Sequence, residues 1–108
     1  MLVVANTPAA RYYHRPIVAF VEEAKLPAIY PLRDFAEVGG LFAYLTDLND
    51  QFRNLADQLD QIFRGSNPRD IPIRQPTSYE FLINVKGAKT IGLTVPPGLF
   101  AQADEVLE

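Results

Sequence analysis

Apolar and polar positions along the first 46 residues follow a pattern that predicts strands separated by helices. The run from Leu2 to Ala5 is apolar and rich in β-branched side chains, which is typical of a strand buried on both faces of a parallel sheet. The elements expected next are a helix at Pro16 to Lys25, a strand at Ala28 to Tyr30, a helix at Pro31 to Val38 and a strand at Leu41 to Leu45. The positions expected to face inward in the first of these helices are Ile17, Phe20, Val21 and Ala24.

The clearest helix of the chain is expected from Asp47 to Arg64. Its large apolar side chains recur at steps of mostly three and four and so share one face: Leu48, Phe52, Leu55, Leu59, Ile62 and Phe63. Asp47 is expected to cap the helix, and the pairs Arg53/Asp57 and Asp60/Arg64 stand at i,i+4 on the polar side. This segment is therefore predicted to be a strongly amphipathic helix.

Turn-forming residues dominate the segment that follows this helix, and its prolines discourage any helix there. The elements expected from there on are a short extended piece at Ile71 to Gln75, a strand at Tyr79 to Ile83, a helix at Val85 to Ile91 capped by Asn84, and a last helix at Leu99 to Leu107. Alternating strands and helices imply an α/β fold with three layers, in which helices cover a parallel sheet.

Ligands of such sheets usually meet the carboxyl ends of the strands. The candidate ligand-binding residues at those ends are Asn6, Thr7, Tyr30, Arg33, Tyr44 and Asp47. Each type of position also has an ordinary structural interpretation. Asn6 and Thr7 are common helix-capping residues, Arg33 can pair with its neighbour on a helix surface, and Tyr44 can pack as a buried strand aromatic.

Composition excludes several classes of function. The 108 residues carry a net charge of −3 from 10 basic and 13 acidic side chains in mixed order, which argues against nucleic acid or an anionic membrane as partner. The chain has no cysteine, and His14 is its only histidine, so a zinc site is not expected. There is no phosphate-binding glycine loop and no nucleophile–base pattern. We therefore expect no enzymatic activity, no metal and no cofactor.

The first residues, MLVVANTPAAR, lack the basic start and the apolar length of a secretion signal. No apolar run approaches the roughly 20 residues that cross a bilayer. From the sequence we expect a chain that has neither a signal peptide nor a membrane span.

The succession LPAIY, FAEVGGLFAY and IFRGSNPRDIPIRQPTSYEFLINVKGAKTIGLTVPPGLFAQADEVLE resembles the C-terminal part of bacterial ABC-transporter substrate-binding proteins of the tryptophan/tyrosine-binding-like group. The tail is the most specific portion, with matching positions at Gly65, Pro68, Pro72, Pro76, Phe81, Asn84, Ala88, Lys89, Gly92, Leu93, Pro96, Ala103, Asp104 and Glu108. The resemblance covers nearly the whole chain and implies that the first lobe and the secretion signal of such a protein lie outside it.

This resemblance implies a type I periplasmic-binding fold, in which two α/β lobes enclose a ligand. Residues 1–46 and 71–108 would then form a unit like the second lobe, and residues 47–70 would form a hinge-crossing helix and segment that pack on the absent first lobe. Ligand groups of the family come from strand-end loops, which match Asn6, Thr7 and Tyr30, and from the hinge-entering segment, which matches Tyr44 and its neighbours. The chain has Ala43-Tyr44-Leu45 where the family commonly has Ser-Tyr-Gly.

Two principal functions follow as hypotheses. The first is a periplasmic solute-binding component, or a fragment of one, that binds a small amino-acid-like or aromatic ligand without chemistry and delivers it to an ABC permease. The second is a truncated lobe that acts only as a self-associating structural module. A small flavodoxin-like enzyme is a weaker alternative. In either of the first two cases we expect a homodimer through the helix Asp47 to Arg64, because its apolar face lacks a partner.

Overall fold

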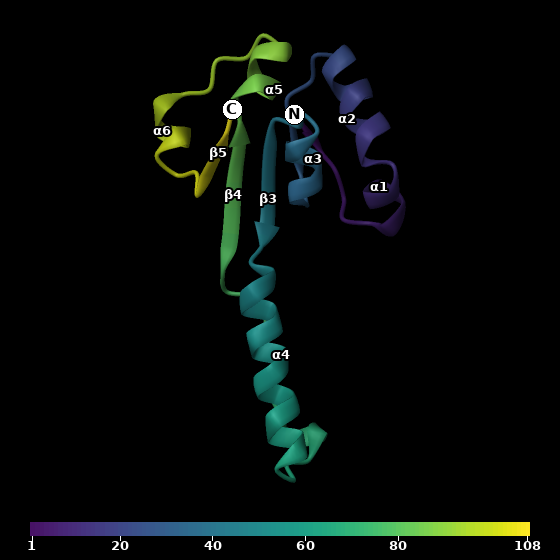
Figure 1. Ribbon diagram of the computed structural model, residues 1–108, viewed down its shortest axis with the longest axis vertical. Coiled ribbons are helices and arrows are strands. Elements are labelled where there is room, and N and C mark those ends of the chain that lie inside the picture. The colour runs from purple at the N-terminus through teal and green to yellow at the C-terminus, as the bar shows by residue number, and fades with distance from the viewer. The chain divides into compact units, whose positions relative to one another are not determined.

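The computed structural model describes residues 1–108 and consists of two compact units (Figure 1). Met1–Leu45 and Glu80–Glu108 form the first, which we call the sheet unit. Thr46–Tyr79 form the second, which we call the arm. No helix in either unit combines the length and the apolar character needed to cross a membrane.

A five-stranded sheet is the framework of the sheet unit, with strands in the order β1-β2-β3-β4-β5. The strands are β1 (Leu2–Val3), β2 (Ala28–Tyr30), β3 (Phe42–Thr46), β4 (Tyr79–Asn84) and β5 (Glu105–Leu107). β1, β2 and β3 are parallel to one another, and β4 is parallel to β5. Figure 1 shows β3 and β4 running in opposite directions, so the sheet is mixed rather than wholly parallel. The predicted α/β fold class is confirmed.

Helices cover both faces of this sheet. They are α1 (Pro8–Tyr12), α2 (His14–Glu23), α3 (Arg33–Glu37), α5 (Val85–Thr90) and α6 (Pro97–Phe100). Ala28 and Tyr30 of β2 pack in one core cluster with Val18 and Val21 of α2. Phe42 of β3 belongs to a second cluster, which includes Ile83, Ala88 and Val95. Because neighbouring strand residues point to opposite faces, these clusters form the two sides of a three-layer arrangement.

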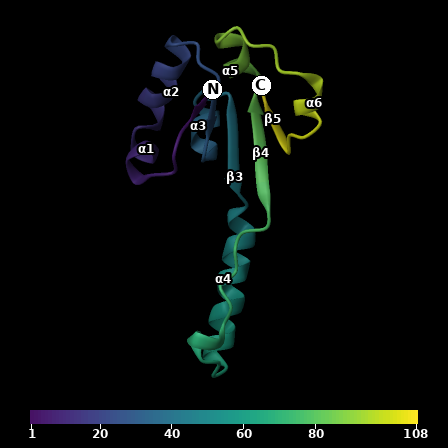
Figure 2. The same ribbon diagram turned by 180° about the vertical axis from the view of Figure 1, so that it is seen from behind.

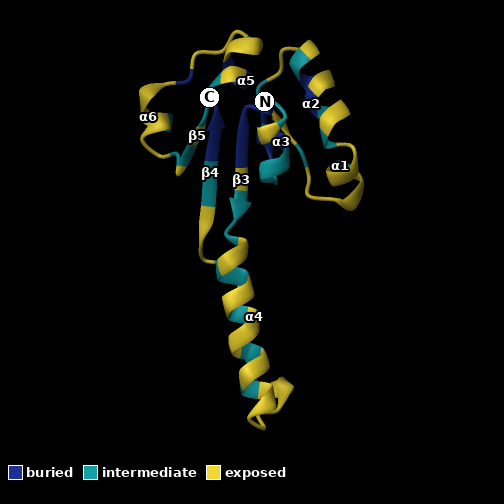
Figure 3. Ribbon diagram, in the orientation of Figure 1, coloured by how far each residue is buried: buried dark blue, intermediate teal, exposed yellow.

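Close contacts around α5 hold the second helical layer to the sheet. Asn84 is buried; its side chain donates a hydrogen bond to the carbonyl oxygen of Ala36 (2.7 Å) and accepts one from the backbone N–H of Gly87 (2.8 Å). A Cβ atom at Gly87 would lie 2.2 Å from the carbonyl oxygen of Gly39. Glycine is therefore required at position 87 because the backbone of the Gly39–Gly40 turn approaches it directly. Figure 3 shows the buried positions gathered in the upper parts of β3 and β4.

The first strand differs from its prediction. β1 is shorter than the Leu2 to Ala5 run, and Leu2 and Val3 are exposed rather than buried on both faces. The reason is its place at the edge of the sheet, where only the following Val4 packs against the core. In α2, Phe20 and Ala24 are exposed while Val18 is buried, so the inward face is rotated from the predicted one.

The predicted helix at Leu99 to Leu107 is wrong. A single short turn, α6, ends at Phe100, and the chain then forms β5, which pairs in parallel with β4. This pairing satisfies backbone groups of β4 that would otherwise form an open sheet edge, and a local helical pattern does not contain that information. The extended piece expected at Ile71 to Gln75 forms no strand.

The arm contains α4 (Leu48–Phe63), which begins and ends within one residue of the prediction. The carboxylate of Asp47 caps it by accepting hydrogen bonds from the N–H groups of Asn49 (2.8 Å) and Asp50 (3.3 Å). Arg64 pairs with Asp60 at 2.8 Å as predicted. No ion pair joins Arg53 to Asp57, because Asp57 instead pairs with Arg74.

The segment that follows α4 returns along the helix, as Figure 2 shows. We call residues 71–76, which follow the short 3₁₀ turn Pro68–Asp70, the strap. Gln58 Nε2 donates to the carbonyl oxygen of Pro72 (3.2 Å), and Arg74 Nη1 donates to Asn54 Oδ1 (3.2 Å). The strap therefore covers polar side chains and leaves the apolar side chains of the helix in water.

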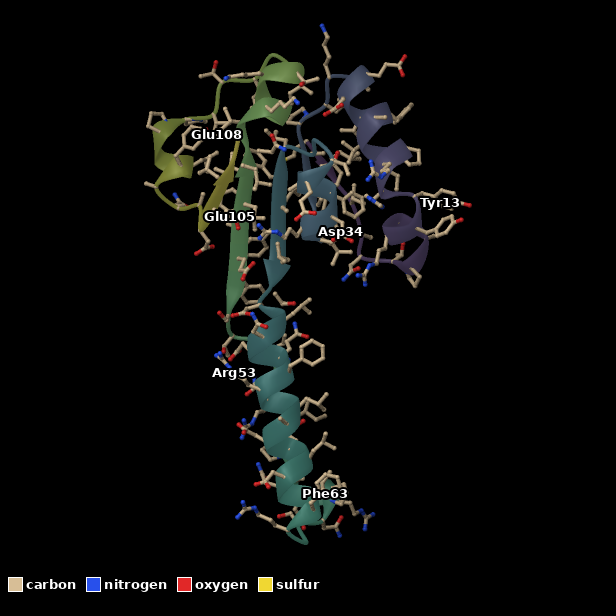
Figure 4. All side chains as sticks on the ribbon, viewed as in Figure 1. Tyr13, Asp34, Arg53, Phe63, Glu105 and Glu108 are labelled. Atoms are coloured by element: carbon tan, nitrogen blue, oxygen red, sulfur yellow. The ribbon has the colours of Figure 1, made fainter.

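All six apolar residues of that face are exposed: Leu48, Phe52, Leu55, Leu59, Ile62 and Phe63. Phe52 is 65% exposed and Phe63, labelled in Figure 4, is 84% exposed. No residue of α4 is buried. We call these six side chains the apolar stripe. A soluble amphipathic helix normally buries such a face, so the stripe has the properties of an interface.

Candidate functional site

The carboxyl ends of β1, β2 and β3 meet at one edge of the sheet, as expected for parallel strands. Since β4 runs opposite to β3, the amino ends of β4 and β5 reach the same edge. We call this the carboxyl edge. The ion pair between Arg11 Nε and Asp34 Oδ2 (3.8 Å) links the loops and helices that follow β1 and β2 there.

Asn6 and Thr7 follow β1 and are both exposed. The Thr7 hydroxyl accepts a hydrogen bond from the backbone N–H of Ala10 (3.1 Å) and so caps α1. The sequence allowed both a capping and a ligand-binding role for Thr7, and the cap is formed. Asn6 lies beside it with its side chain open to solvent.

Tyr30 is the last residue of β2, and its side chain is buried in the core. Its side chain is 2% exposed, and its ring stacks on that of Phe35 with centroids 4.9 Å apart. Burial, together with the negative charge of Glu22, raises the pKa of the Tyr30 hydroxyl to about 12. The position follows from strand alternation, because Tyr30 points to the face that α2 and α3 cover. The Tyr30 side chain therefore packs against the helices of this face instead of being exposed at the strand end.

Arg33 begins α3 at the carboxyl edge and makes two ion pairs. Its Nε donates to Glu37 Oε1 (3.0 Å), and its Nη2 donates to Glu105 Oε1 (2.5 Å), which is contributed by the distant strand β5. The hydrogen bond from Arg33 lowers the pKa of Glu105. Arg33 therefore connects α3 to the edge strand β5 through a charge-assisted hydrogen bond.

Tyr44 lies in β3 on the face opposite to the buried Ala43 and is half exposed. Its ring meets that of Phe81 edge to face at 6.5 Å, and Phe81 in turn contacts Phe42 at 5.7 Å. An exposed aromatic surface thus begins near the carboxyl end of β3 and continues into the core.

Asp47, the remaining candidate, belongs to the arm. Its carboxylate is used as the cap of α4. The structure therefore brings Asn6, Thr7, Arg33 and Tyr44 to the carboxyl edge, places Tyr30 in the core, and gives Asp47 a capping role.

Glu80 and Glu105 were not among the candidates, although both lie at the carboxyl edge. Glu105 lies within the segment predicted as a helix at Leu99 to Leu107, and it is 72 residues away from Arg33 in the sequence. No local pattern contains this contact, because it depends on the pairing of β5 with β4.

A hollow of about 600 Å³ lies at the opposite edge of the sheet unit. Its walls carry both charges, among them Arg15, Lys86, Glu22 and Glu108, the last labelled in Figure 4. The hollow is open to solvent, and its lining is more polar than that of most small-molecule pockets. No group of three or more histidine or acidic residues in the chain is placed to hold a metal ion.

This architecture is an α/β unit in which helices cover both faces of a mixed sheet and polar and aromatic residues stand near the strand ends. The ABC transporter substrate binding protein family matches residues 2–107, and the chain belongs to this family. The family resemblance inferred from the sequence is confirmed. No curated protein matches the chain.

Solved structures share the fold. A conserved domain protein from Vibrio cholerae O1 biovar El Tor has a TM-score of 0.84 at 19% identity, covering 96% of this chain and 34% of that one. An ABC domain from Streptococcus pneumoniae in complex with L-Trp has a TM-score of 0.85 at 24% identity, covering 97% and 36%. A ligand-free, open substrate binding protein with adhesive properties from Clostridium difficile has a TM-score of 0.70 at 17% identity, covering 98% and 35%. The chain thus spans about a third of the length of these proteins.

Proposed function

We propose that the chain supplies one ligand-contacting lobe of a solute receptor and binds a small amino-acid-like or aromatic molecule without chemistry. The observation that carries this proposal is the family match over residues 2–107. The neighbour that holds L-Trp has the same fold over nearly the whole of this chain, which supports an aromatic amino acid as the ligand class.

The ligand would meet the carboxyl edge. Asn6 and Thr7 offer short polar side chains there, and Tyr44 offers an aromatic ring of which half is exposed. Arg33 would act there as well, and Asp47 remains a ligand-binding candidate that belongs to the arm. Tyr30 would support the edge from within the core, where its ring already packs on Phe35.

The proposed role includes delivery of the ligand to an ABC permease in the periplasm. Both the permease and the compartment come from the family, whose members serve ABC transporters. The hypothesis of a small enzyme receives no comparable support, because the family is defined by binding rather than by a reaction.

We further propose the domain organisation expected from the sequence, with residues 1–46 and 71–108 as the second lobe and residues 47–70 as a segment that packs on a first lobe. The exposed apolar stripe supports this, because large exposed apolar patches mark surfaces that contact another protein surface. Where no first lobe is present, we propose that a second copy of the chain covers the stripe and forms a homodimer.

Titration of the isotope-labelled chain with L-Trp and L-Tyr, followed by NMR, tests the binding role. Half a cleft buries too little of a ligand for tight binding, so we expect dissociation constants above about 1 mM. The residues whose NMR signals shift should cluster at the carboxyl edge, and the shifts should be smaller in the variant Tyr44→Ala. Phe20→Ala, which removes an exposed aromatic ring from the middle of α2, should have no effect.

Two outcomes would contradict this proposal. Micromolar affinity would show that the isolated chain holds a complete site. A dimeric chain without any shifts at the carboxyl edge would favour the alternative, a self-associating structural module.

A further inference from the structure

The apolar stripe of α4 has the spacing of helices that pair along a common seam. Five of its side chains succeed one another at steps of 4, 3, 4 and 3 residues: Leu48, Phe52, Leu55, Leu59 and Ile62. Such a heptad spacing places these side chains in one row, which interlocks with the same row on a second helix. The stripe is therefore complementary to itself, and a second copy of the chain supplies the matching helix.

The exposed area of the stripe is sufficient for such a pair. Its side chains together expose on the order of 600 Å². Two copies would bury about 1,200 Å², which is the size of a small specific interface. No residue of α4 is buried within its own chain, so the whole stripe is available for this contact.

The two flanks of the stripe differ in what covers them. Gln51 and Gln58 lie on one flank and are half-buried, and Gln58 donates its hydrogen bond to the strap. Asn49, Ala56 and Phe63 lie on the other flank and are exposed. Neither flank carries a charged side chain, so ion pairs between the helices do not select their relative direction. The strap selects it instead, because it leaves only one flank open.

The direction of the partner helix follows from these flanks. In a parallel pair, the strap-covered flank of each helix meets the open flank of the other, so Phe63 would face the strap of the second copy. In an antiparallel pair, the two open flanks meet. Phe63, which is 84% exposed, and Ala56, near the middle of α4, then extend the apolar contact. The small side chain of Ala56 also allows the two helix backbones to approach closely.

We propose that a second copy of this chain covers the apolar stripe through antiparallel pairing of the two α4 helices. Leu55 of one copy packs on Leu59 of the other. Phe52 packs on Ile62 in the same way, and Ala56 lies next to the twofold axis. This arrangement rests on the homodimer proposed above and specifies which residues of the two copies meet.

Single introduced cysteines identify the positions that meet, because the chain contains no cysteine of its own. Ala56→Cys places a thiol next to the twofold axis, so a short bis-maleimide should join two copies of this variant at about 100 μM protein. Arg53→Cys, on the polar side of α4 and labelled in Figure 4, is the matched control and should not be cross-linked. A parallel pair would hold the two Ala56 positions on opposite flanks. A sedimenting dimer of Ala56→Cys that is not cross-linked would therefore overturn the antiparallel pairing.

A mixture of Phe52→Cys and Ile62→Cys chains gives a second measurement. The antiparallel pair brings these two positions together, so oxidation should yield mainly disulfide-linked dimers that contain one chain of each variant. A parallel pair would join identical chains instead. Mass spectrometry separates the products, because the two variants differ in mass, and a predominance of identical pairs would overturn the proposal.

Sedimentation equilibrium of the unmodified chain separates this geometry from the functions proposed above. A monomer at about 100 μM would overturn both the antiparallel pairing and the homodimer. Cross-linking of identical chains in a dimer would overturn the pairing alone. The solute-binding function is tested by the NMR titration of the carboxyl edge, and no result of the cross-linking changes it.

Discussion

Placing a charge on the apolar stripe should abolish self-association of this chain. The six residues of the stripe together expose on the order of 600 Å² of side-chain surface, so two copies would bury about 1,200 Å², the lower end of specific interfaces. Phe52 is 65% exposed, which corresponds to roughly 130 Å² and to about 3 kcal/mol when buried. A symmetric dimer contains this residue twice, so Phe52→Asp should weaken dimerisation by about 6 kcal/mol, or on the order of 10⁴-fold.

Sedimentation equilibrium at about 100 μM protein measures the effect, because this concentration detects dimers with micromolar Kd. Arg53→Asp is the matched control: it introduces the same side chain one position further along α4, off the stripe, at a residue without an ion pair. We expect a dimer for the unmodified chain and for Arg53→Asp, and a monomer for Phe52→Asp. A monomeric unmodified chain, or equal association of the two variants, would refute the reasoning.

Two further predictions concern the sheet unit. Gly87→Ala should lower the free energy of unfolding, measured by urea titration, by roughly 1 to 3 kcal/mol, because the new Cβ would meet the backbone of Gly39. Gly98→Ala is the control and should leave this free energy almost unchanged, because the space around Gly98 is open. Equal stability of the two variants would contradict the packing at Gly87. The pKa of Tyr30, about 12 in the folded chain, exceeds its ordinary value, so its contribution to stability should be complete below about pH 10 and be lost as the pH rises towards 12. Urea titrations at several pH values in this range give the free energy of unfolding as a function of pH. This free energy should fall with rising pH more steeply for the unmodified chain than for Tyr30→Phe. An equal pH dependence of the two proteins would argue against burial of the hydroxyl.

The local sequence pattern was sufficient to predict those helices and strands whose structure depends mainly on their own residues. α4 carries its apolar period, its Asp47 cap and its stop at Gly65, whose φ is +100°, within a single stretch of sequence. The strand Ala28–Tyr30 has the predicted bounds, and Asn84 caps α5 as expected. The family resemblance in the tail also followed from the order of residues alone.

The candidate site could be predicted only in part. The carboxyl ends of β1, β2 and β3 do share an edge, so Asn6, Thr7, Arg33 and Tyr44 lie there as the topology requires. Tyr30 ends β2 as predicted, but its burial could not be predicted, because it results from the packing of α2 and α3 on that face of the sheet. Nothing near Arg33 in sequence indicates Glu105 as its partner.

The amino-acid sequence is therefore sufficient to predict the helices and strands that have strong apolar periods and caps, together with the α/β class. Long-range contacts are needed to explain why the tail forms β5 instead of a helix, why Glu105 meets Arg33, and why the strap covers the amide side of α4 while the apolar stripe remains exposed. The physical reason is that strand pairing, ion pairs and burial are contacts between residues far apart in the chain, and these contacts can outweigh the weak local preferences of short segments.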